Sequence, residues 1–160
     1  MVETRLKLTE AEQDSATVRE LAEGAMLYKA SADAVDTIFG MAPAYEKVAP
    51  FPVMQNLGQA IELALKSWLK ENGTDYEHRR GHNLISLLNR AKKQCPNTFG
   101  KVDEAPIVLL NEFYATQVLR YGGGKMHRSV PHFGPLQKAA KVILDACRVP
   151  DPETYSWEGG

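Results

Sequence analysis

Two residues able to do chemistry flank a run of glycines in "RYGGGKMH", residues 120–127. Arg120 can hold a phosphate through two parallel hydrogen bonds, and His127 can take up or release a proton near neutral pH. The glycines at 122–124 would let backbone N–H groups approach the same phosphate oxygens. Together these groups could cleave RNA without a metal, His127 moving protons and Arg120 stabilising charge on the phosphate.

The same segment also allows two roles without catalysis. Lys125 and Arg128 add positive charge beside the glycines, so the loop could hold an anion without cleaving it. Alternatively, Arg120 interacts with the last carbonyls of a helix, the glycines end that helix, and His127 lies on the surface. Tyr121 directly follows the arginine and could stack on a base. The residues themselves leave all three roles open.

Two further clusters of cations could follow a phosphate backbone. Arg79 and Arg80 are adjacent in a polar segment, and "RAKK" at 90–93 places Arg90, Lys92 and Lys93 on one helix. Salt-dependent binding to nucleic acid is typical of such clusters, although a solvated helix face carries the same residues.

His82 is a candidate for either a ligand contact or a structural bond. It stands at the start of an expected helix, where we expect its ring to bond to free backbone groups. His78 lies four residues earlier, but no carboxylate or thiol follows at a supporting interval, so we expect no metal site. We also find no glycine-rich nucleotide motif and expect no cofactor.

The charges are unevenly distributed although the net charge is only −1. Residues 1–65 hold 5 Lys or Arg and 10 Asp or Glu, whereas residues 66–128 hold 11 and 6. An anionic partner should therefore meet the middle of the chain. Pairing of opposite charges between neighbouring helices is the alternative.

Composition predicts a single cytoplasmic domain. The chain has 160 residues, 44% of them hydrophobic, and its two cysteines are too few for a secreted disulfide scaffold. No apolar stretch approaches the roughly 18 residues that a membrane span needs. We therefore expect neither export nor membrane insertion.

The spacing of apolar residues predicts an up-and-down bundle of four to five helices. Thr9 to Glu12 could form a capping box at the start of a long first helix, whose inward stripe would include Tyr28. Trp68 is expected in the core. One domain should span residues 1–150, with helices at about 10–39, 53–72, 83–95, 103–121 and 135–147, followed by an aperiodic tail at 151–160.

Part of the chain, about residues 56–147, resembles the HEPN family of nucleotide-binding helical bundles. The match lies in "AIELALKSWL" at 60–69, in "GHNLISLL" at 81–88, and in "LNEFYATQVLRYGG" at 110–123. The resemblance implies an all-α bundle that pairs as a homodimer. It also implies either a metal-independent endoribonuclease with an Arg-x6-His motif or an inactive relative that binds nucleotide or RNA.

Tyr121 follows the arginine where active members of this family carry a polar residue, which favours binding over cleavage. The resulting prediction is a nucleotide- or RNA-binding bundle whose ligand contacts are Arg79, Arg80, His82, Arg120, Tyr121, Lys125, His127 and Arg128. The family resemblance implies a nucleotidyltransferase or an antitoxin as partner protein. A ribonuclease using Arg120 and His127 and a bundle that contacts only proteins remain the alternatives.

Overall fold

Helices form where apolar residues recur every three or four positions, as the sequence predicts, and the fold is all-α. The computed structural model describes residues 16–39, 50–74, 82–121 and 130–157. Its elements are α2 (Val18–Phe39), α3 (Phe51–Glu71), α4 (Leu84–Gln94), α5 (Pro96–Phe99), α6 (Ala105–Tyr114), the 3-10 helix η3 (Val118–Tyr121) and α7 (Phe133–Ala146). No helix within these ranges is both long enough and apolar enough to cross a membrane.

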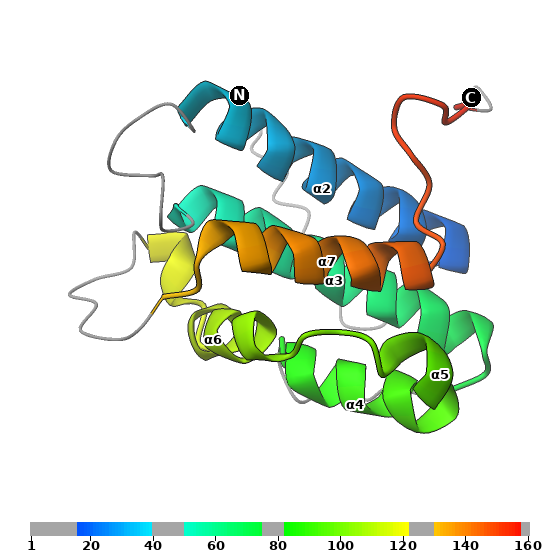
Figure 1. The fold of residues 1–160 in the computed structure, drawn as a ribbon. Coiled ribbons are helices and arrows are strands. Elements are labelled where there is room, and N and C mark those ends of the chain that lie inside the picture. Colours follow the sequence, from blue (N-terminus) through cyan, green and yellow to red (C-terminus); the bar gives the residue numbers. More distant parts are fainter. Residues whose placement is uncertain (1–15, 40–49, 75–81, 122–129, 158–160) are drawn as a thin grey trace, which may run out of the picture.

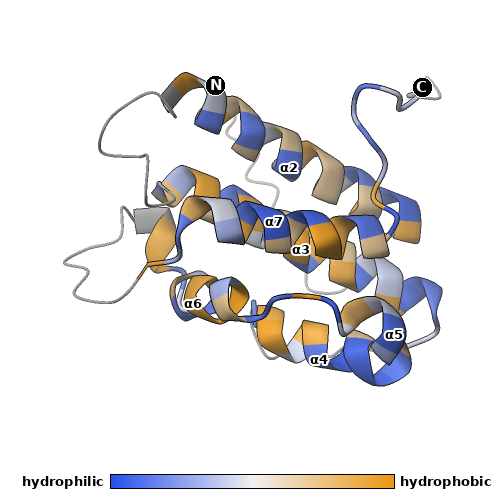
Figure 2. Ribbon diagram, viewed as in Figure 1, coloured by the Kyte–Doolittle hydropathy of each residue, from blue (hydrophilic) through white to orange (hydrophobic). Residues whose placement is uncertain are grey.

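Helix α3 is the centre of the bundle. It contacts α2, α4, α6, η3 and α7, and Figure 1 shows α2 on one side of it, α4 and α6 on the other, and α7 in front. Buried residues occur around most of its circumference, which is typical of a helix enclosed by others. Figure 2 shows hydrophobic residues dominating α6, whereas hydrophilic residues gather around α5.

Small residues let α2 and α3 approach each other closely. A Cβ atom added at Gly24 would lie 2.9 Å from Leu63 Cδ1, and the interface also holds the buried Ala25 and Ala60. Trp68 of α3 packs edge-on against Phe99 of α5, with ring centroids 4.9 Å apart. This contact joins the short helix α5 to Trp68, which was expected in the core and is partly buried against it.

Helix α2 begins with a capping box. Thr17 Oγ1 accepts the backbone N–H of Glu20, and Glu20 Oε2 accepts the N–H of Thr17, at 3.1 and 2.7 Å. These reciprocal bonds satisfy two free donors at the start of α2. The box predicted at Thr9 to Glu12 lies outside the described residues. Tyr28 was expected in the core but is 41% exposed.

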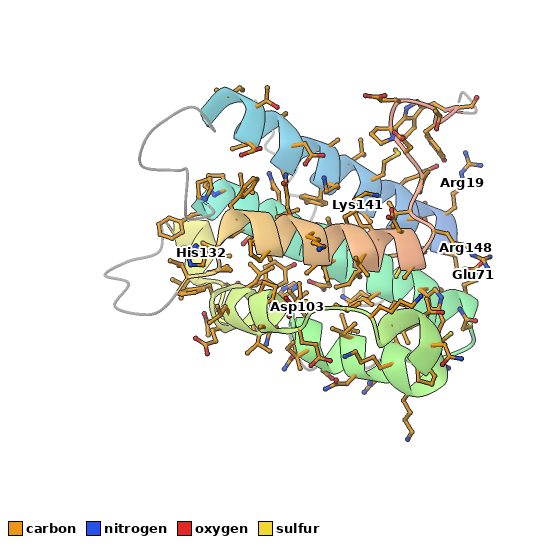
Figure 3. The ribbon with its side chains drawn as sticks, viewed as in Figure 1. Arg19, Glu71, Asp103, His132, Lys141 and Arg148 are labelled. Carbon is orange, nitrogen blue, oxygen red and sulfur yellow. The ribbon has the colours of Figure 1, made fainter. Side chains whose placement is uncertain are left out.

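The fourth predicted helix is shorter than expected. Asp103, beside the connection that leads into α6 (Figure 3), accepts the N–H of Ala105 at 3.2 Å, but α6 ends at Tyr114 and not near residue 121. Thr116 bonds through its hydroxyl to the carbonyls of Glu112 and Phe113, and Gln117 adopts a left-handed φ of 59°. Both features interrupt an α-helix, and the chain continues as η3.

The last helix begins two residues before its predicted start. Helix α7 starts at Phe133, and Pro135 occupies its first turn, where a missing N–H leaves no intrahelical bond unmade. As predicted, the tail that follows has no helix as far as residue 157, where the described residues end, but it is attached to the bundle. The Tyr155 hydroxyl donates a hydrogen bond to Glu23 of α2, and its ring contacts Trp157 edge-on.

Candidate functional site

Most of the predicted ligand contacts lie outside the described residues. Those outside are Arg79, Arg80, Lys125, His127 and Arg128, together with the side chains of Arg120 and Tyr121. The backbone of Arg120 and Tyr121 forms the end of η3. Whether Arg120 and His127 share a site therefore stays a prediction, and of the eight residues only His82 has a described side chain.

The sequence predicts that the His82 ring caps the start of α4, but the structure shows a different role for it. Its Nδ1 atom lies 2.8 Å from Glu62 Oε2 on α3, while Asn83 is the N-cap residue. The Glu62 side chain is 2% exposed and that of His82 is 30% exposed. The ring of His82 also meets Tyr114 of α6 edge-on at 5.7 Å. The imidazole of His82 therefore pairs with the buried carboxylate of Glu62. At the start of α4, the side chain of Asn83 accepts a backbone N–H in its place.

Glu62 is the centre of a buried polar network. The Tyr114 hydroxyl lies 2.6 Å from Glu62 Oε2 and 2.7 Å from Gln59 Oε1, and Lys66 Nζ donates to Glu62 Oε1 at 2.5 Å. Burial by itself raises the pKa of Glu62, but the bonds from His82, Lys66 and Tyr114 and the charge of Lys66 outweigh it. Together they lower the pKa from 4.5 to about 2. Glu62 is therefore ionised at neutral pH and can only accept hydrogen bonds.

Gly58 makes this network geometrically possible. A Cβ atom added there would lie 2.4 Å from Tyr114 Cδ2, well inside van der Waals contact. The absent side chain lets the Tyr114 ring lie directly on α3, with its hydroxyl one helical turn further along at Glu62. The network thus joins α6 and His82, which lies two residues before α4, to the central helix.

Two asparagines, one from α6 and one directly before α4, accept backbone N–H groups at the start of α4. Asn83 Oδ1 accepts the backbone N–H of Ser86 at 2.9 Å, and Asn111 Oδ1 of α6 accepts the N–H of Leu84 at 2.8 Å. Asn111 Nδ2 also lies 3.5 Å from Asn83 Oδ1. Because a backbone N–H can only donate, these bonds identify which amide atom is the oxygen in each side chain.

An open groove of about 620 Å³ runs along α4 beside α6. Its polar lining consists of Asn83, Ser86, Asn89, Arg90, Lys93 and Asn111, and its apolar lining of Ile85 and Val108. No carboxylate is among these described residues. We call this surface the α4–α6 groove; its chemistry suits a ligand that has negative charge and hydrogen-bond acceptors.

The basic cluster at 90–93 divides between two surfaces. Arg90 and Lys93 line the α4–α6 groove, whereas Lys92 forms an ion pair with Glu104 and does not line it. The sequence pattern indicates these cations but not the buried network of Glu62 or the contact between Asn83 and Asn111. A signal existed for Glu62, because it falls between the inward-facing Ile61 and Leu65.

A second hollow, between α2, α7 and the tail, has a lining in which acidic residues outnumber basic ones. It measures about 370 Å³ and is lined by two lysines, which are paired with aspartates on their own helices, and by two further acidic residues of the tail. The acidic lining residues are Asp33, Asp145, Asp151 and Glu153. This excess of carboxylates makes it a poor site for an anion.

No family model, curated protein or solved structure matches this chain. Within the described ranges, no group of three His, Cys, Asp or Glu side chains could hold a metal ion. Fold and surface thus define the class of protein: an all-α bundle with a groove of cations and amides on one side.

Proposed function

We propose that this protein is a HEPN-like bundle that binds single-stranded RNA in the α4–α6 groove. The observation that carries the proposal is the lining of the groove, where Arg90 and Lys93 lie beside asparagine amides and no carboxylate is among the described lining residues. Cations that neutralise phosphates supply most of the affinity for nucleic acid. Side-chain amides can bond to base edges, which are accessible in a single strand.

The dimensions of the groove favour a strand over a single nucleotide. Its lining extends from Asn83 to Lys93, which at 1.5 Å per residue is about 15 Å along α4. The partly exposed Ile85 and the exposed Val108 offer apolar surface between the polar groups. A strand lying here would place phosphates near the cations and a base near the asparagines.

The test is the affinity for a fluorescent single-stranded RNA, measured by anisotropy in EDTA over a range of salt concentrations. We expect Lys93→Ala to weaken binding and to reduce the slope of log affinity against log salt by about 0.7, the value of one phosphate contact on a single strand. Lys92→Ala is the matched control, since it removes the same charge from the same helix outside the groove. Lys141→Ala on α7 (Figure 3) is a more distant control.

Equal losses for Lys93→Ala and Lys92→Ala would show that only general charge matters, and absence of binding would refute the proposal. Integrity of the RNA in the same samples tests the ribonuclease alternative, because cleavage in EDTA that is lost in His127→Ala would indicate catalysis by that residue. The homodimer, the nucleotidyltransferase or antitoxin partner and the cytoplasmic location stay predictions.

A further inference from the structure

The side-chain oxygens of the two asparagines in the α4–α6 groove accept hydrogen bonds from within the protein. Their side-chain nitrogens are the groups that could donate to a ligand. Asn83 Oδ1 accepts from both Ser86 N and Asn111 Nδ2, which uses both of its lone pairs. Asn111 Oδ1 accepts the first N–H of α4, that of Leu84. Within the part of the chain that the structure describes, Asn83 Nδ2 therefore keeps two N–H donors and Asn111 Nδ2 keeps one.

These donors lie close together and are held in place. Asn111 Nδ2 is 3.5 Å from Asn83 Oδ1, and Asn83 Nδ2 shares a carbon atom with that oxygen, so the two amide nitrogens are neighbours. An asparagine normally reads adenine with one donor and one acceptor, at N7 and N6. Asn83 cannot do so, because turning its oxygen outward would leave the N–H of Ser86 without its cap.

We propose that this donor pair gives the α4–α6 groove a preference for guanine over adenine. Guanine presents two adjacent acceptors, O6 and N7, whereas adenine places a donor, the N6 amine, where guanine has O6. Two N–H groups match the guanine edge and meet an N–H group on adenine. This inference rests on the RNA binding proposed above and adds the base that the groove selects.

Other polar groups of the groove do not supply this selectivity. The Ser86 hydroxyl can rotate to donate or accept, and the exposed Asn89 can present either end of its amide. Arg90 and Lys93 are donors as well, and we assign them to phosphates because they lie about two and about three turns beyond Asn83 along α4.

The experiment compares two short RNAs, an oligoadenylate and the same strand with one guanosine. The wild-type chain should bind the guanosine strand about tenfold more tightly. Inosine in place of guanosine should preserve the preference, because inosine retains O6 and N7, and 7-deazaguanosine should lose most of it.

The decisive variant is Asn83→Asp. Aspartate is an equally good N-cap, so the bond to Ser86 N survives, but the outward N–H₂ becomes an oxygen that repels O6 and accepts from N6. We expect the ratio of guanosine to adenosine affinity to fall to about one or below. Asn89→Asp is the charge-matched control, which should weaken both strands equally and leave the ratio unchanged.

Helical circular dichroism and thermal unfolding check that both variants fold. Equal wild-type affinity for the two strands would overturn the inference while leaving RNA binding intact, as would an unchanged ratio in Asn83→Asp. If neither strand binds, the proposed function and this inference both fail.

Discussion

Replacement of Glu62 by glutamine tests the buried network most sharply. The pKa of Glu62 is lowered from 4.5 to about 2 in the folded protein, so the folded state prefers the ionised form. At 1.36 kcal/mol per pKa unit, this preference is worth about 3 kcal/mol of unfolding free energy. A lowered pKa stabilises the fold above pH 4.5, and this stabilisation is lost as the pH falls from about 4.5 to about 2.

Urea unfolding of wild type and Glu62→Gln between about pH 7 and about pH 2.5 measures this contribution. The variant should be less stable at neutral pH by up to about 3 kcal/mol, and the difference should shrink as the medium becomes acidic. Other carboxylates titrate in both proteins and cancel from the comparison. Glu71→Gln at the exposed end of α3 (Figure 3) is the control and should follow the wild-type curve. A constant difference between wild type and Glu62→Gln at all pH values would refute the reasoning.

Two further substitutions examine the surroundings of Glu62. Gly58→Ala should destabilise the fold by about 1–3 kcal/mol in thermal unfolding, because its Cβ would lie 2.4 Å from Tyr114 Cδ2. The control is Gly134→Ala, which should be neutral or stabilising because nothing lies within 4 Å of its Cβ. Equal effects of the two substitutions would contradict this account of Gly58. His82→Ala should lower the unfolding free energy by about 1–2 kcal/mol by removing a donor from Glu62. It should reduce RNA affinity less than Lys93→Ala does, and a larger reduction would instead make His82 a ligand contact.

The helices could be predicted because periodicity reflects burial. Each of the observed long helices coincides with a stripe of apolar residues at three- and four-residue spacing, and α3 and α4 begin and end within two residues of the prediction. The end of α6 was missed because it depends on the left-handed Gln117, and no residue type at that position signals such a φ. Helix α5 was missed because four residues are too few to show a period.

The site was less predictable because its members come from three separate elements. The pairing of His82 with Glu62 joins residues 20 positions apart, and Tyr114 adds a third segment 52 residues from Glu62. Sequence patterns identify which residues face inward but not which polar groups meet there. The same applies to Asn111, whose bond to Leu84 N becomes evident only when α6 lies beside α4.

Binding of RNA in the α4–α6 groove can be mapped most directly by nuclear magnetic resonance. Isotope-labelled protein is titrated with the guanosine-containing strand while backbone and side-chain amide signals are followed. The largest changes should occur in α4 from Leu84 to Lys93 and in the side-chain amides of Asn83 and Asn111. Changes centred on α2 or α7 instead, or no changes at all, would contradict the assignment of this groove as the RNA-binding surface.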